Sequence, residues 1–227
     1  SQPTAGDNYQ SFSDAFDALN LSGVGEGGVT FLVTEGQSFN ENPPILTVVG
    51  EESKQVIFKN SNVPGTNNPT IKPTGSGNSD FAVKLFQSNW VTFDGINIQC
   101  KPTNIEPNLQ LEYGFILANG SSYNTIKNST VDLEKTNLNF SIGISTVNGG
   151  NNYNKFINNT VTDCSGGYFF NGGDELTYDE WNMIMTEDDG VSFIGNIGGN
   201  HSNPVYAVRF NYQKDFYLVN TVIDGVT

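Results

Sequence analysis

Basic residues are scarce in this chain. Its 227 residues include 10 Lys and Arg against 24 Asp and Glu, which gives a formal net charge of −14 at pH 7. This balance argues against a nucleic-acid partner, because neutralising phosphates needs clustered Lys and Arg. It argues equally against binding to an anionic membrane surface.

Long apolar runs are missing as well. No stretch of the sequence approaches the roughly 18–20 apolar residues of a membrane span, so we expect no membrane insertion. The chain does not open with a basic segment followed by an apolar one, and we therefore expect that any secretion signal has been removed.

Residues that usually build metal or anion sites are few. Histidine and arginine occur once each, as His201 and Arg209, and cysteine occurs twice, as Cys100 and Cys164. One histidine and two cysteines argue against a histidine-rich metal centre, a zinc site and a disulfide scaffold. A single arginine excludes an anion pocket that is built from several arginines.

The chain is instead rich in aromatic residues, at 12%, and in glycine, with 25 residues. One short pattern recurs along it, apolar–x–(Gly/Asn)–x–x–apolar, which is the mark of a repeat architecture. Its Gly or Asn positions are Asn60, Gly95, Asn128, Asn158 and Asn220, with a weaker copy at Gly195. Since Gly and Asn tolerate positive φ, each position is predicted to be a sharp bend between two short strands.

A second family of predicted strands precedes most of these bends and alternates apolar with small or polar residues. Its copies span 81–85, 113–117, 140–144 and 206–210. Units of variable length with a constant strand–bend–strand centre predict an all-β fold, a single-stranded right-handed parallel β-helix. An antiparallel sandwich is the alternative, because it also contains many short strands.

A short helix is predicted before the first coil. Phe12, Phe16 and Leu19 recur at helical spacing, Ser13 is a candidate N-cap, and Gly23 follows as a stop signal. Such a helix would cover the otherwise open first coil of the stack.

The sequence predicts one domain over residues 1–227. Residues 1–23 form the leader and the capping helix, and the coils occupy 24–227. No capping element is visible after the last repeat. We therefore expect the C-terminal end to stack end to end with another molecule, to be covered by loops, or to continue in a longer protein.

The two cysteines lie at the ends of equivalent predicted strands, two coils apart. Stacked coils are about 4.8 Å apart, which places the Cα atoms of Cys100 and Cys164 roughly 9–10 Å apart. A disulfide rarely tolerates more than about 7 Å, so we predict two free, partly buried thiols.

The first coils carry a resemblance to a known superfamily. After the capping helix come the strand Val29-Thr30-Phe31-Leu32-Val33, the segment Gly36-Gln37-Ser38-Phe39-Asn40-Glu41 and the strand end Val56-Ile57-Phe58. This order resembles secreted parallel β-helix proteins of the pectin-lyase-like superfold, and most of all uncharacterised exported β-helix proteins of Bacteroidetes-type bacteria. The resemblance implies export to the cell envelope or exterior, with a polysaccharide as the usual partner. The same superfold hosts lyases, hydrolases, esterases and non-catalytic surface proteins, so the resemblance does not choose among these functions.

Catalytic groups of this superfamily usually project from one outward strand face. Strict alternation predicts the following residues on that face: Ala82, Lys84, Gly114, Ile116, Ser141, Gly143, Ala207 and Arg209. None of them is a carboxylate, so the face lacks the acid–base pair that glycoside hydrolysis requires. On the neighbouring strands, Asp94 and Lys127 are predicted to stack as an ion pair.

Acidic residues gather in the segment 174–189. The spacing Thr177-x-x-Glu180 ahead of apolar residues matches a capping box, so we predict a helical insertion there. One interpretation is a carbohydrate-binding rim, with Trp181 as a stacking platform and Tyr178, Asp179 and Glu180 beside it. The other is a solvated acidic face with Trp181 packed onto the stack.

An enzyme would need other residues from this part of the chain. The weak catalytic candidates are Asp188, Asp189, His201 and Arg209, in an order similar to that of polygalacturonase-like hydrolases but without their surrounding motifs. A lyase would use Arg209, with Lys84 on the same face, and Ca²⁺ held by Asp188 and Asp189. The sequence indicates no other cofactor.

Taken as a whole, the sequence predicts an exported or cell-surface β-helix protein that contacts polysaccharide without cleaving it. The alternatives are a polysaccharide hydrolase or lyase and a structural segment of a larger surface protein. The enzyme hypothesis requires the four catalytic candidates to converge on one groove. The binding hypothesis requires exposed aromatic rings, and the structural hypothesis requires neither.

Overall fold

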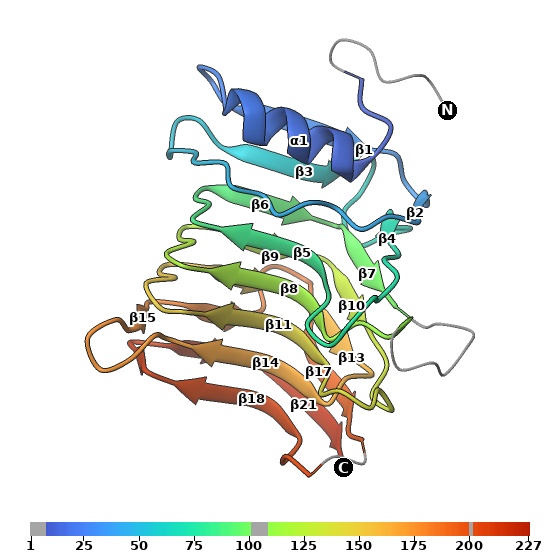
Figure 1. Cartoon of the computed structure of the whole chain (residues 1–227), viewed down its shortest axis with the longest axis vertical. Coiled ribbons are helices and arrows are strands. Elements are labelled where there is room, and N and C mark those ends of the chain that lie inside the picture. The colour runs from blue at the N-terminus through green and yellow to red at the C-terminus, as the bar shows by residue number, and fades with distance from the viewer. Residues whose placement is uncertain (1–7, 101–108, 200–201) are drawn as a thin grey trace.

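The computed structural model describes residues 8–100, 109–199 and 202–227. The chain is a parallel β-solenoid in which three sheets run along the stack and one helix covers its first coil (Figure 1). His201, one of the predicted catalytic residues, lies outside the described residues.

Sheet I contains seven parallel strands in the order β1-β3-β6-β9-β12-β16-β20. Their bounds are β1 Val29–Val33, β3 Val56–Asn60, β6 Val91–Asp94, β9 Thr125–Lys127, β12 Lys155–Ile157, β16 Met183–Met185 and β20 Tyr217–Val219.

Sheet II also contains seven strands, in the order β2-β4-β7-β10-β13-β17-β21. Their bounds are β2 Ser38–Phe39, β4 Thr70–Ile71, β7 Asn97–Gln99, β10 Thr130–Asp132, β13 Thr160–Thr162, β17 Ser192–Ile197 and β21 Thr221–Val226.

Sheet III has five strands in the order β18-β14-β11-β8-β5, and a two-stranded pair, β15 with β19, lies beside the stack. Their bounds are β5 Phe81–Phe86, β8 Tyr113–Ala118, β11 Ile142–Val147, β14 Gly166–Asn171, β18 Tyr206–Asn211, β15 Asp179–Glu180 and β19 Gln213–Lys214. The named strands pair in parallel throughout, which confirms the β-helix and excludes the antiparallel sandwich.

The recurring Gly/Asn pattern marks the corner between sheets I and II. Gly95, Asn128, Asn158 and Asn220 all have positive φ, between 48° and 69°. Two of the predicted bends are wrong. Asn60 ends β3 without a positive φ, and Gly195 lies within β17, in register with Thr162 of β13. The weaker copy therefore belongs to sheet II, because a longer turn separates β16 from β17.

Stacked aromatic and aliphatic side chains fill the interior. The rings of Phe31, Phe58 and Phe93 stack one on the next, with centroids 4.7 and 5.1 Å apart. Since inward residues of successive coils lie at the strand spacing, rings of one column can stack face to face.

Strand alternation breaks once in every strand of sheet III. The first of two consecutive inward residues is always Ala or Gly: Ala82, Gly114, Gly143, Gly167 and Ala207. A Cβ on Gly143 would lie 2.3 Å from Cγ1 of Val161, so no larger side chain fits there. The outward assignment of Ala82, Gly114, Gly143 and Ala207 was therefore wrong, and Ser141 is fully buried. Lys84, Ile116 and Arg209 do lie on the outward face, although Ile116 is only 6% exposed.

Helix α1, Phe12–Ser22, covers the first coil with its buried face, Phe12, Ala15, Phe16 and Leu19. The predicted helix and its stop at Gly23 are confirmed, but the N-cap is Ser11, not Ser13. Ser13 instead donates its backbone N–H and its hydroxyl to the carboxylate of Glu41, which ties the helix to the coil below.

The helical insertion predicted over 174–189 is absent. The segment instead contains β15 and β16, and Thr177 donates to the Asp174 carboxylate in a local turn. The capping-box pattern was misleading because Glu180 pairs with Lys214 of β19 rather than closing a helix turn.

The last coil exposes apolar residues. Leu218 of β20 is 45% exposed, whereas its partner one coil earlier, Ile184, is fully buried, so the last coil presents apolar residues to solvent. Cys100 and Cys164 are free, as predicted, but they are buried rather than partly buried, and burial raises the pKa of Cys100 to about 11. Within the described ranges, no helix is long and apolar enough to span a membrane.

Candidate functional site

Three surfaces outside the core gather polar or aromatic side chains. They are the corner between sheets I and II, an aromatic ladder along one edge, and the outer face of sheet III. The chemistry that each surface can perform depends on which of its groups are already engaged within the chain.

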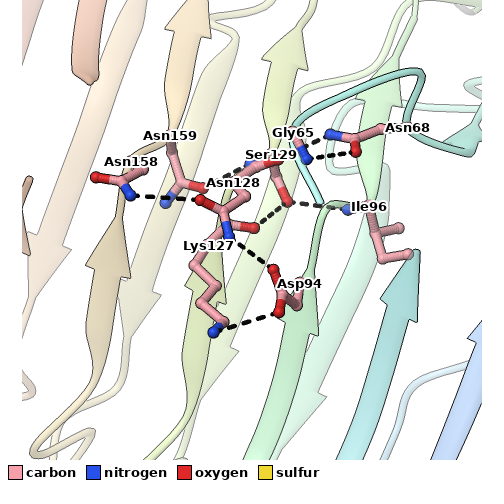
Figure 2. A network of polar contacts seen from close by, with 9 residues as sticks. All are labelled: Gly65, Asn68, Asp94, Ile96, Lys127, Asn128, Ser129, Asn158 and Asn159. Atoms are coloured by element: carbon pink, nitrogen blue, oxygen red, sulfur yellow. Dashed lines mark hydrogen bonds and ion pairs between the residues drawn. The ribbon is translucent and has the colours of Figure 1, made fainter. Parts of the chain in front are cut away.

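The corner carries a carboxylate and an ammonium group. Lys127 Nζ lies 3.3 Å from Oδ2 of Asp94, and the Asn128 amide donates to Oδ1 of the same carboxylate at 2.7 Å (Figure 2). This confirms that Asp94 and Lys127 stack as an ion pair. Asp94 is buried rather than exposed, so both of its oxygens are engaged within the fold.

Amides tie neighbouring coils and one loop to this corner. Asn158 donates to Oδ1 of Asn128 at 3.4 Å, and Asn68 donates to the backbone carbonyl of Asn128 at 2.8 Å. The Gly65 N–H in turn donates to Oδ1 of Asn68. These contacts are made within the chain, so the corner network stabilises the turns and does not present free groups to a ligand.

A ladder of five aromatic rings follows the edge where the chain passes from sheet III to sheet I. Successive centroids are 4.8 to 6.4 Å apart in the order Trp90, Tyr123, Tyr153, Trp181 and Tyr217. Both faces of the Trp181 ring are therefore covered, by Tyr153 and by Tyr217. A sugar that stacks on an aromatic face would find only the edge of this indole.

The other residues of the predicted carbohydrate-binding rim differ in their surroundings. Asp179 is fully buried and accepts hydrogen bonds from the Thr146 hydroxyl and from Asn151, and burial raises its pKa. Glu180 forms an ion pair with Lys214, with 3.2 Å between Oε1 and Nζ. Tyr178 is exposed.

The predicted catalytic residues do not lie together. Asp188 and Asp189 are exposed in the turn between β16 and β17, at the corner of sheets I and II, whereas Arg209 lies on the outer face of β18 in sheet III. Within the described residues, no hydrogen bond or ion pair joins either aspartate to Arg209. Nor do three or more His, Cys, Asp or Glu residues of the described chain form a group that could hold a metal ion.

The outer face of sheet III carries what we call the aromatic–cation patch: Phe140, Phe169, Tyr206 and Arg209. The guanidinium carbon of Arg209 lies 5.2 Å from the Phe169 centroid and 5.9 Å from that of Tyr206. Phe140 and Tyr206 stack with centroids 5.5 Å apart. Rings at these distances attract the cation and fix its position.

The missing side chain at Gly166 makes room for the patch. A Cβ on Gly166 would lie 2.6 Å from the ring of Tyr206, so the ring from β18 crosses the β14 strand and reaches Phe140. Burial raises the pKa of the Tyr206 hydroxyl, and the nearby Arg209 opposes that rise. The hydroxyl therefore stays protonated and can donate a hydrogen bond.

Sequence reasoning found Arg209 but missed Phe140, Phe169 and Tyr206. Strict alternation places residues three apart on opposite faces, yet Tyr206 and Arg209 share a face because two inward residues separate them. The pairing of a small residue with an apolar one at positions 82–83, 114–115 and 143–144 was the available signal.

Comparison with known proteins gives a likeness in fold. No family model and no curated protein matches the sequence. An alginate lyase from Paenibacillus sp. is structurally similar, with a TM-score of 0.65 and 12% identity over 96% of this chain, which spans 66% of that protein's length. A putative glycosyl hydrolase from Parabacteroides merdae aligns at a TM-score of 0.36 and 10% identity, covering 93% of this chain and 88% of the other. At such identities, the similarity to the alginate lyase shows that both chains have a parallel β-helix fold, and nothing more specific.

Proposed function

We propose that this chain is an exported β-helix protein that binds polysaccharide through the aromatic–cation patch on sheet III, without cleaving it. One observation carries the proposal. Arg209 lies over two aromatic rings on an exposed face, and no carboxylate of the described chain forms an ion pair with it. A guanidinium in that position keeps its N–H donors for a ligand.

The fold supports a polysaccharide as the ligand. The long, straight faces of a solenoid suit an extended polymer, because successive coils present equivalent positions at a constant spacing. The structurally similar alginate lyase is consistent with a polysaccharide ligand. Aromatic rings add rigid contact area at low entropic cost, and tyrosine adds a polar end.

The chemistry of the patch favours binding over hydrolysis. Glycoside hydrolysis usually needs two carboxyl groups about 5–10 Å apart, and the four residues of the patch include none. Glu112, whose charge acts on Tyr113 of the neighbouring strand β8, is buried and accepts hydrogen bonds from Asn137 and Asn139.

A polysaccharide panel tests the proposal. Purified protein is passed over immobilised neutral and acidic polysaccharides, and Tyr206→Ala is compared with Trp181→Ala. We expect retention on at least one polysaccharide, lost in Tyr206→Ala and kept in Trp181→Ala. Retention that depends on Trp181 and not on Tyr206 would move the binding site to the aromatic ladder.

Cleavage and export are tested separately. Reducing-end and unsaturated-product assays over the same panel, with and without Ca²⁺, are expected to show no product. New products lost in Asp189→Asn would support the enzyme alternative at the β16–β17 turn. Export is tested by fractionating cells that express the gene in its native form.

A further inference from the structure

The outer face of sheet III carries a second cation in register with Arg209. The register runs Lys84↔Ile116↔Ser145↔Phe169↔Arg209, one residue from each of the five strands. Four strand spacings of about 4.8 Å place the two ends of this column about 19 Å apart.

Both cations of the column lie over rings. Lys84 Nζ is 5.5 Å from the Phe81 centroid, and Arg209 lies over Phe169 at 5.2 Å. Between described residues, neither forms an ion pair with a carboxylate. Lys54, Lys127 and Lys214 each pair with an Asp or Glu on other surfaces, whereas Lys59, Lys72 and Lys155 form no ion pair between described residues either. The rings beneath Lys84 and Arg209 therefore distinguish these two cations from the other described ones.

The two outward columns between the cations contain no carboxylate. Ile116 and Ser145 are buried at the foot of the column, and the adjoining outward column holds Phe81, Tyr113, Ile142, Gly166 and Tyr206. In a chain with a net charge of −14, this face combines two cations that lie over aromatic rings with two outward columns that hold no carboxylate.

We infer that the ligand of sheet III is an anionic polysaccharide that runs along the solenoid axis and contacts Arg209 at one end of the face and Lys84 at the other. The inference rests on the proposed function and adds the charge class and the direction of the polymer. Arg209 can hold a carboxylate or sulfate group with two parallel N–H donors, and Lys84 acts as a point charge. A neutral glucan would leave both cations without a partner.

Two contacts about 19 Å apart also predict a dependence on chain length. An oligosaccharide that reaches only Arg209 forms one charged contact, whereas a longer one forms both, and the second contact is then intramolecular. Removing Lys84 should therefore weaken long ligands and leave short ones unchanged.

Titration calorimetry on the whole chain tests the inference. The probes are a length series of oligogalacturonates, polygalacturonate, dextran sulfate and neutral dextran. The variants are Arg209→Gln, Lys84→Gln and the charge-matched control Lys155→Gln, whose lysine is exposed on β12. Circular dichroism verifies that each variant is folded.

We expect Arg209→Gln to lower the affinity for oligogalacturonates of every length by about tenfold, which is the loss of one charge-assisted pair. Lys84→Gln should lower it by severalfold for the long members alone, and Lys155→Gln should leave it unchanged. Binding of polygalacturonate without dextran sulfate would assign a carboxylate, and the reverse would assign a sulfate.

Three results would overturn the inference. Neutral dextran could bind as tightly as the acidic polymers, which would keep polysaccharide binding and remove the charge class. Lys155→Gln could weaken binding as much as Arg209→Gln, which would indicate non-specific attraction. Binding of no polysaccharide at all would overturn the proposed function itself.

Discussion

Lys127 and Arg209 are both cations on outer strand faces of one solenoid, yet their surroundings differ. Lys127 is neutralised by a buried carboxylate that also accepts a hydrogen bond from Asn128. Arg209 lies over the rings of Phe169 and Tyr206, with no described carboxylate paired to it. A polar group on a β-helix surface therefore indicates a ligand site only when it does not already form hydrogen bonds or ion pairs within the chain.

This difference separates two kinds of residue. Residues of the corner network should control stability and leave ligand binding alone. Arg209 of the aromatic–cation patch should control binding and leave stability nearly unchanged, because it is exposed. Variants of both kinds test that separation, beginning with the one of largest expected effect.

The inward glycines of sheet III should be the least tolerant positions. Gly143→Ala would place a Cβ 2.3 Å from Val161 Cγ1 and 2.9 Å from the Gly167 carbonyl oxygen. We expect the free energy of unfolding to fall by about 3 kcal/mol, as for other overpacked cores. Urea denaturation measures this, with Gly25→Ala as the control, because nothing lies within 4 Å of a Cβ there. Equal stabilities of the two variants would contradict the close packing of sheets II and III.

The corner network should come next. Asp94→Ala removes the acceptor of the Asn128 amide and the partner of Lys127, and we expect a loss of about 2 kcal/mol. Lys127 is partly exposed, and its solvation limits the cost. Asp189→Ala, on an exposed turn, is the matched control and should change the free energy of unfolding by less than about 0.5 kcal/mol. A neutral result for Asp94→Ala would remove the network as a stabilising element.

The aromatic ladder should affect stability by a smaller amount. Trp181→Ala removes two ring contacts, each worth about 0.5–1.5 kcal/mol, and should lower the thermal midpoint while polysaccharide binding persists. Tyr178→Ala is the control, because Tyr178 is exposed beside the ladder. Loss of binding in Trp181→Ala without loss of stability would restore Trp181 as a sugar platform.

Two aspartates should give opposite dependences of stability on pH. Burial raises the pKa of Asp179, so the folded state holds its proton more tightly than the unfolded state does. Stability should therefore fall as pH rises from the ordinary aspartate pKa through the raised one, and Asp179→Asn should flatten this slope. Hydrogen bonds lower the pKa of Asp174, so its contribution is lost as pH falls through the lowered value, and Asp174→Asn should flatten the slope in that range. Chemical denaturation from pH 2 to pH 7 measures both, and slopes that match the wild type in both variants would refute the assignment.

The fold was largely predictable because the Gly/Asn bends are local. Whether a residue can adopt a positive φ depends mainly on its own type. The bends at Asn128 and Asn158 can therefore be predicted from the sequence. The break in alternation at Ala82 and Gly143 is not local, because it depends on side chains of sheet II that lie a strand away.

The candidate site was less predictable for the same reason. Tyr206 reaches Phe140 only because Gly166 lacks a side chain on the strand between them, and no periodicity along one strand reveals a gap on the next. In the acidic segment 174–189, a local signal instead predicted a helix that does not form. Its capping-box spacing is local, but pairing of Glu180 with Lys214 in a neighbouring coil prevailed over that local signal.

The most direct test of the separation compares Arg209→Gln with Asp94→Ala in two measurements on the same samples, the free energy of unfolding and the affinity for polygalacturonate. We expect Arg209→Gln to lose about tenfold in affinity and less than about 0.5 kcal/mol in stability. We expect Asp94→Ala to lose about 2 kcal/mol in stability and to keep its affinity. The contrary result, a destabilised Arg209→Gln that still binds or a stable Asp94→Ala that does not, would show that the two surfaces exchange the roles assigned to them.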